Sequence, residues 1–177
     1  GLPPKFVELA VTSPPYINAV DYTRTHQLEM YWIGLISPDD GPLAKMKRQH
    51  IGTETVRACE YKELRLFGLP DLDDLLESIH LVDPRRSFIV YKYFVDMQNN
   101  FQEIFRVLMP KGRYVVVVGN NVIRGYRIPT HKFFMNIAEK VGFEVENFFA
   151  SEIIRHFIKI PRRERINDDW VIILHKR

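Results

Sequence analysis

Apolar residues recur along the chain with two periods, and the order of these periods predicts the fold. Continuous apolar runs typical of strands cover residues 6–12, 113–118, 143–154 and 169–175. A rhythm of three and four residues, typical of helices, covers 23–35, 83–108 and 129–141. This alternation predicts an α/β layer architecture with a mostly parallel sheet. The last two strands follow each other without a helix, so we expect them to be antiparallel.

Single residues refine the boundaries of these elements. Gly34 and Gly142 are expected to end the first and third helices, and Thr130 to cap the start of the third. The long second helix is expected to break near Asp96. The strand 113–118 (RYVVVV) is uninterrupted in its apolar character, which is typical of a strand buried on both faces of a parallel sheet.

Residues 37–83 interrupt the alternation of strands and helices. The prolines and glycines of this stretch show no long period, so we interpret it as an excursion from the core, part helix and part loop. The chain has 177 residues, close to the roughly 150 expected for one domain. We therefore interpret 1–177 as a single domain, or as one large part of a bigger one.

Composition excludes several classes of protein. A single cysteine, Cys59, rules out an internal disulfide, and no paired Cys or His spacing predicts a metal site. The longest apolar runs are far shorter than the roughly 20 residues that span a bilayer, so we expect an intracellular protein with no membrane partner. The net charge is only +3, but residues 155–165 hold five of the basic residues and one acid. The positive charge is therefore local.

The most specific motif follows the first strand. Ser13, Pro14, Pro15 and Tyr16 would lie at the carboxyl edge of the sheet, where α/β proteins bind ligands. The Ser13 hydroxyl and the Pro14 carbonyl are two hydrogen-bond acceptors, and Pro15 fixes the backbone between them and the aromatic ring. Two acceptors suit an exocyclic amino group, and the Tyr16 ring can stack on the base that carries it.

The segment VTSPPYINAVDY resembles the catalytic motif of the DNA amino-methyltransferases, which methylate N4 of cytosine or N6 of adenine. The segments LMPKGRYVVVV and WVIILHK are similar to the second half of such a domain. The resemblance implies a Rossmann-like fold dependent on S-adenosylmethionine, of which this chain is the C-terminal half. It assigns Ser13, Pro14 and Tyr16 to a flipped base in DNA, with Pro15 as scaffold. Serine in the first position is similar to the N4-cytosine subgroup.

The chemistry implied is direct transfer of a methyl group to the amino nitrogen, which needs positioning and no covalent intermediate. Cys59 has no proline before it, so we assign it no role. The resemblance implies a prokaryotic restriction-modification enzyme in the cytoplasm, associated with the nucleoid. Methylation of N6 of adenine, or of an RNA amino group, is the alternative within enzymes. A non-catalytic DNA-binding subunit, or half of a split methyltransferase, is the alternative from another class.

One departure from the family concerns the cofactor. The family binds it with a Phe-x-Gly-x-Gly loop, but no two of the nine glycines here are two residues apart. We expect an upstream segment or a second chain to carry that loop. Asn120 and Asn121, at the end of the strand 113–118, are candidates for cofactor contacts, although turn residues of this kind need no ligand.

Further polar residues are candidates for contacts with DNA. Three follow the motif, two lie in the excursion that could recognise the target, and three lie in the basic segment, where they would grip phosphates. A helix cap or a solvated surface would explain them equally well. These candidates are Asp21, Tyr22, Arg24, Lys47, Arg48, Arg162, Arg163 and Arg165.

Overall fold

The computed structural model describes residues 1–17, 21–37, 44–153 and 168–177. Its strands are β1 (Val7–Thr12), β2 (Leu108–Gly119), β3 (Asn121–Ile123), β4 (Tyr126–Ile128), β5 (Phe143–Glu152) and β6 (Asp168–Lys176). Its helices are α1 (Tyr22–Thr25), α2 (Gln27–Trp32), α3 (Ala44–Lys47), α4 (Pro70–Val82), α5 (Pro84–Val107) and α6 (Thr130–Val141), with a short 3-10 helix at Ala58–Glu60.

Four strands form one sheet in the order β1-β2-β6-β5. β1 runs parallel to β2, and β6 pairs antiparallel with β2 on one side and with β5 on the other. β1, β2 and β5 therefore point the same way, and β6 is inserted against them. The predicted α/β class and the antiparallel final pair are confirmed. The carboxyl ends of β1 and β2 meet at one edge, where the motif loop begins.

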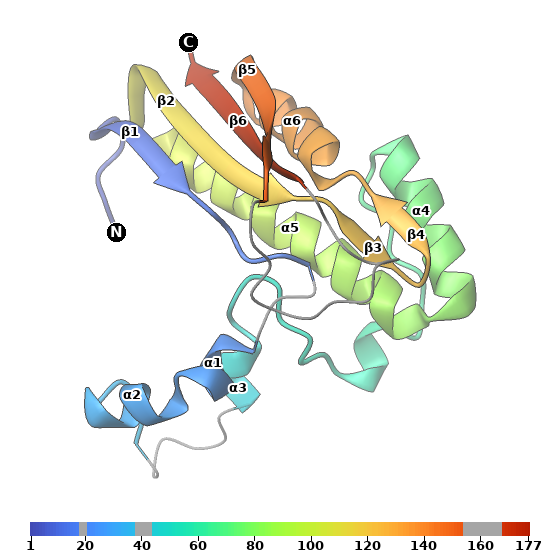
Figure 1. The fold of residues 1–177 in the computed structure, drawn as a ribbon. Coiled ribbons are helices and arrows are strands. Elements are labelled where there is room, and N and C mark those ends of the chain that lie inside the picture. The colour runs from blue at the N-terminus through green and yellow to red at the C-terminus, as the bar shows by residue number, and fades with distance from the viewer. Residues whose placement is uncertain (18–20, 38–43, 154–167) are drawn as a thin grey trace.

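Helices cover one face of this sheet. α5 and α6 both lie behind it in the view of Figure 1, and α4 packs on α5. Aromatic rings fill the space between helices and sheet: Phe94 meets Phe133 with ring centroids 5.4 Å apart, and Phe101 meets Phe134 at the same distance. The strands contribute alternate residues to this core, among them Tyr114, Val116 and Val118, each at most 1% exposed.

The opposite face of the sheet is bare in the described part of the chain (Figure 1). Leu9 and Val11 of β1 remain 56% and 65% exposed. Val11 pairs with Val115 of β2, which pairs in turn with Ile173 of β6, so an apolar row crosses the sheet on this side. The predictions that the first strand is buried, and that 113–118 is buried on both faces, are therefore wrong for the described residues.

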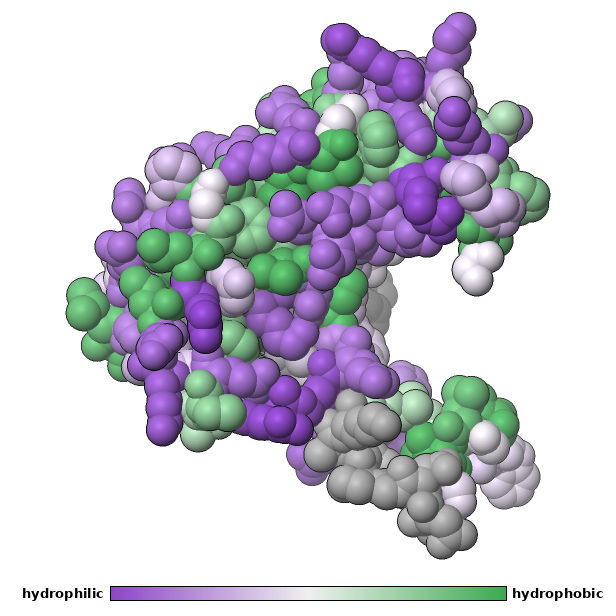
Figure 2. Space-filling view, turned by 180° about the vertical axis from the view of Figure 1, so that it is seen from behind, coloured by the Kyte–Doolittle hydropathy of each residue, from purple (hydrophilic) through white to green (hydrophobic). Residues whose placement is uncertain are grey.

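Two predicted helices differ from expectation. α5 runs unbroken through Asp96, whose carboxylate bonds the Lys92 ammonium one turn earlier at 2.5 Å. The helix expected over 23–35 is divided at His26 into α1 and α2, and Gly34 ends it with a φ of +70°. Its apolar side chains do not reach the core, and Trp32 is 88% exposed. Figure 2 shows apolar surface on this projecting arm.

The sequence pattern missed two elements and misplaced a cap. α4 fills the end of the excursion, with Pro70 in its first turn and with Leu72, Leu76 and Ile79 buried. The hairpin β3–β4 follows β2 and turns at Arg124 and Gly125, both with positive φ. Thr130 does not cap α6, since its hydroxyl lies 3.4 Å from the Asn121 side-chain oxygen, and Pro129 holds the cap position. Gly142 ends α6 in the left-handed conformation, as predicted.

Candidate active site at the carboxyl edge of the sheet

The motif loop leaves β1 and is tied to the helical layer by its backbone. The Tyr93 hydroxyl of α5 donates a hydrogen bond of 2.9 Å to the Pro15 carbonyl oxygen. Tyr93 is 1% exposed and its ring stacks on Phe134 at 6.0 Å, so the donor itself is fixed in the core. Burial raises the pKa of Tyr93, which keeps its hydroxyl protonated. Pro14 is buried and Ser13 is exposed beside it.

The Tyr16 side chain lies against the ends of β2 and β6. Its hydroxyl donates a hydrogen bond of 2.8 Å to the Asp169 carboxylate. Its ring covers Gly119 so closely that a Cβ at that position would lie 2.7 Å from a ring carbon. Burial, followed by the bond to Asp169, raises the pKa of Tyr16. The ring is still 37% exposed, so part of it is open to a ligand.

The residues just after the motif contact the excursion. The Asp21 carboxylate accepts a bond of 3.0 Å from the Arg24 backbone amide and caps α1, and it pairs with the Lys47 ammonium at 2.8 Å. The bond from Lys47 lowers the pKa of the Asp21 carboxyl. The Tyr22 ring meets His50 edge-on at 6.3 Å. The structure therefore brings Asp21, Tyr22 and Lys47 together next to the loop.

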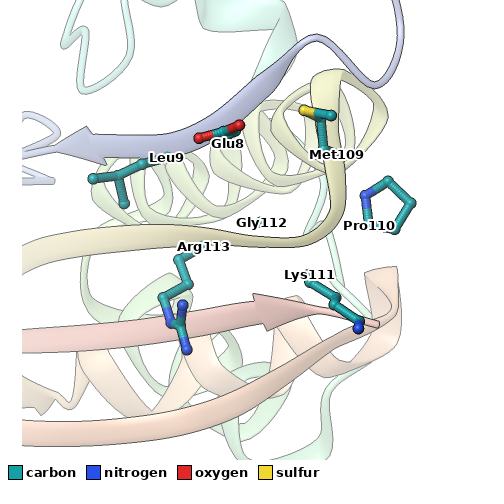
Figure 3. Close-up of a pocket in the computed structure, with 7 residues that line it drawn as sticks. All are labelled: Glu8, Leu9, Met109, Pro110, Lys111, Gly112 and Arg113. Atoms are coloured by element: carbon teal, nitrogen blue, oxygen red, sulfur yellow. The ribbon is translucent and has the colours of Figure 1, made fainter.

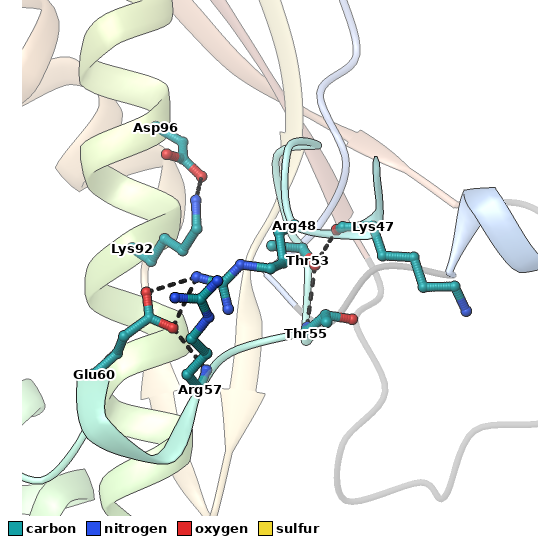
Figure 4. A network of polar contacts seen from close by, with 8 residues as sticks. All are labelled: Lys47, Arg48, Thr53, Thr55, Arg57, Glu60, Lys92 and Asp96. Atoms are coloured by element: carbon teal, nitrogen blue, oxygen red, sulfur yellow. Dashed lines mark hydrogen bonds and ion pairs between the residues drawn. The ribbon is translucent and has the colours of Figure 1, made fainter. Parts of the chain in front are cut away.

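Arg48 is held by a carboxylate of the excursion. Its guanidinium bonds both oxygens of Glu60 at 2.9 and 3.0 Å, and Glu60 also accepts a bond from the Arg57 backbone amide. Figure 4 shows this network, in which Lys47 extends away from Glu60. Both cations are thus paired within the chain. Arg24 is exposed, and contacts of these three residues with DNA stay predictions.

Asn120 and Asn121 follow β2 and both contact the start of α6. The Asn120 side-chain oxygen lies 2.7 Å from His131 Nδ1, and Asn121 is 2% exposed beside the Thr130 hydroxyl. The His131 ring stacks on Trp170 with centroids 3.9 Å apart and planes 3° apart, and burial lowers the pKa of His131. These contacts give both asparagines a role in the fold, and their cofactor contacts stay a prediction.

Other candidates lie away from this edge. Arg162, Arg163 and Arg165 fall outside the described residues. A cavity of about 430 Å³ lies at the opposite ends of β1 and β2, between Glu8, Gly112 and Arg113 (Figure 3). In the described part of the chain, no three metal-binding side chains cluster, and no helix has the length and apolar character to cross a bilayer.

Sequence reasoning missed the partners that hold the loop. The apolar pattern marks Asp169 only as the start of a strand, and Tyr93 only as part of a helix. The signal for Asp169 was an acidic residue directly before the apolar run WVIIL, at the end of a strand that the antiparallel pairing returns to the edge of β2. Tyr93 carried no signal, because a tyrosine in a helical rhythm predicts only a core position.

The chain is similar in sequence to enzymes named as Type II methyltransferases. It is 33% identical over 157 residues to M.AvaI of Nostoc sp., which covers 82% of this chain and 32% of that enzyme. It is 24% identical over 160 residues to M.MvaI of Kocuria varians, covering 88% of this chain and 34% of that enzyme. M.BsoBI of Geobacillus stearothermophilus is 25% identical over 162 residues, covering 77% and 31%. The chain spans about a third of the length of these curated relatives.

Among solved structures, a DNA modification methylase from Thermus thermophilus is 19% identical, with a TM-score of 0.49 over 99% of this chain and 48% of that chain. The same protein complexed with S-adenosyl-L-methionine has a TM-score of 0.40 over 50% of this chain and 38% of that chain. No protein-family model matches. The sequence relatives are methyltransferases, the class of enzyme that the motif loop predicts.

Proposed function

We propose that these residues form the base-binding half of a DNA amino-methyltransferase. The observation that carries this proposal is the loop Ser13 to Tyr16, which lies at the carboxyl edge of the sheet with its backbone bonded to Tyr93 and its aromatic ring bonded to Asp169. A loop held at both points can present acceptors and a ring in a fixed arrangement. The similarity to Type II methyltransferases supports the same assignment.

Each residue of the loop has a role in this proposal. The Ser13 hydroxyl and the Pro14 carbonyl accept hydrogen bonds from the exocyclic amino group, and Tyr16 stacks on the flipped base. Both bonds favour a pyramidal amino nitrogen with its lone pair free of the ring, and that nitrogen gives up one proton when it gains the methyl group. Because serine stands at position 13, we propose N4 of cytosine as the target, with N6 of adenine as the alternative.

The methyl donor that we infer is S-adenosylmethionine, which supplies an electrophilic methyl group when bound. The described residues fit the base better than this cofactor. They contain no glycine-rich loop, and the two asparagines proposed for it are bonded to α6. We therefore propose that a polypeptide outside these residues, upstream or on a second chain, carries the cofactor loop.

The bare face of the sheet supports a missing partner of this kind. Leu9, Val11 and Val115 form an apolar surface that water would cover unless another layer packs on it. β1 is also the first strand in the sheet order and has no neighbour on its outer side among the described residues. A further strand could pair there. We place the activity in the cytoplasm of a prokaryote, at its nucleoid.

The first experiment is a calorimetric titration of S-adenosylmethionine into the 177-residue chain and into a longer protein that contains it. We expect binding only to the longer protein. Binding of the cofactor to the chain alone, with the stoichiometry of a monomer, would contradict the proposal that another segment carries the loop.

The second experiment measures methyl transfer from labelled cofactor to DNA by the longer protein, followed by analysis of the nucleosides. N4-methylcytosine is the expected product, and N6-methyladenine would move the assignment to the alternative. Ser13→Ala and Tyr16→Ala should reduce transfer, while Tyr61→Ala, outside the site, serves as the matched control. DNA binding that survives Tyr16→Ala, with no methylated product from the wild type, would favour a non-catalytic subunit.

A further inference from the structure

We propose that Asp169 is a positioning residue for Tyr16, and that it fixes the ring in the orientation in which it stacks on the flipped base. This inference rests on the proposed function, because it concerns the aromatic platform of the same site. Asp169 lies 153 positions after Tyr16 in the chain and outside the motif. The contact is therefore a product of the fold.

The pairing of the strands places Asp169 where the ring needs it. In the antiparallel ladder between β2 and β6, Asp169 lies directly opposite Gly119. The Tyr16 ring lies over Gly119, and its hydroxyl reaches the Asp169 carboxylate at 2.8 Å. A Cβ at position 119 would lie 2.7 Å from the ring and 3.1 Å from that carboxylate. Gly119 is thus the floor of a seat, and Asp169 is its far wall.

The bond to Asp169 supplies what the backbone cannot. The Pro15 carbonyl is fixed by Tyr93, so the main-chain position of the loop is set from the helical side. Rotation about the side-chain bonds of Tyr16 is then the freedom that remains to the ring. A hydrogen bond from a neutral hydroxyl to a carboxylate is stronger than one between neutral groups, and it removes this freedom before a base arrives. Base binding then no longer carries the entropy cost of ordering the ring.

A double-mutant cycle in the longer protein tests the inference. The variants are Tyr16→Phe, Asp169→Ala and the two together, assayed for methyl transfer and for the fluorescence of DNA with 2-aminopurine at the target position. Each single change is expected to lower the rate about ten-fold, because one charge-assisted hydrogen bond is lost. The double variant should be no slower than either single one. Asp169→Asn keeps an acceptor oxygen and should recover most of the activity.

Three readouts separate positioning from a general structural role. Affinity for S-adenosylmethionine and the melting temperature should stay close to those of the wild type in Asp169→Ala. The 2-aminopurine signal should rise, since a mobile ring quenches the flipped base less. Asp168→Ala, next to Asp169 and exposed, is the matched control and should leave rate and fluorescence unchanged. An unaltered rate in Asp169→Ala, or effects that multiply in the double variant, would overturn the inference.

Failure of the proposed function can be told apart from failure of this inference. The same cycle, measured by denaturant unfolding, reports whether the two side chains interact whatever reaction the protein catalyses. Coupling in unfolding together with base-dependent fluorescence, but without methylated product, would retain the positioning role and overturn the proposed reaction. Methylated product without coupling between the two changes would retain the reaction and overturn the role of Asp169. A wild type that gives neither product nor a base-dependent signal would overturn both.

Discussion

The two faces of the central sheet differ in what covers them, although neighbouring residues of one strand supply both. In β2, Val116 and Val118 are at most 1% exposed beneath α5 and α6, whereas Val115 and Val117, which alternate with them, lie on the bare face and only partly escape water. An uninterrupted run of valines suits a strand that is covered on both sides. The strand therefore carries the composition of a two-sided core, and the described residues provide one of the two layers.

The largest expected effect comes from damage to the covered face. Phe94 is fully buried and contacts Tyr93, Phe133 and Phe134. Phe94→Ala should lower the free energy of unfolding by about 3–5 kcal/mol, because it leaves a cavity in addition to the lost transfer energy. Urea unfolding followed by circular dichroism measures the change. Phe149→Ala, at 48% exposure on β5, is the control, and an equal loss there would erase the distinction between the faces.

A smaller effect is expected where the covered side reaches the site. Tyr93→Phe keeps the ring in the core and removes the donor to the Pro15 carbonyl. The loss should be about 1–2 kcal/mol in unfolding, since a partly buried acceptor loses its partner. In the longer protein, methyl transfer should fall as the loop loosens. Tyr91→Phe, on the same helix and half-buried, should change neither quantity, and a matching loss there would remove the special role of Tyr93.

The fold was predictable where a local pattern and the burial agree. The rhythm of α5, the glycine stop after α6 and the returning strand pair β5–β6 all follow from spacing and turn residues. α4 was missed because Leu72, Leu76 and Ile79 stand in a stretch divided by prolines and glycines. The arm α1–α2 was misjudged for the opposite reason: its apolar residues have helical spacing, yet Trp32 is exposed. Spacing indicates a face but does not supply a partner for it.

The site was predictable only as far as it lies within one segment. Ser13 to Tyr16 form a motif because proline, hydroxyl and ring follow one another after a strand. Asp169 and Tyr93 contact that motif from 153 and 78 positions away. Strand register and helix packing bring them there, and neither property can be derived from one sequence without the pairing of β2 with β6. Long-range positioning contacts are therefore the part of a site that sequence reasoning misses first.

The covered side also predicts a dependence on pH. His131 is 5% exposed and burial lowers its pKa, so the folded protein holds this ring neutral. The unfolded chain binds a proton near pH 6.5. The free energy of unfolding should thus fall as the pH drops through about 6.5, and level off below the pKa of the folded state. Unfolding of the wild type minus that of His131→Gln, measured from about pH 5 to 8, isolates the effect, and a difference without slope would contradict it.

The smallest effect is the most informative about the bare face. In the 177-residue chain, Val115→Thr should change the free energy of unfolding by less than about 0.5 kcal/mol, because its hydroxyl can reach water. Val116→Thr, the next residue, points into the core and should cost about 1–3 kcal/mol. In a longer protein that completes the domain, the two costs should approach each other, since a second layer would then bury position 115. If Val115→Thr stays neutral in that protein, no polypeptide packs on this face, and the apolar row must be explained without a second layer.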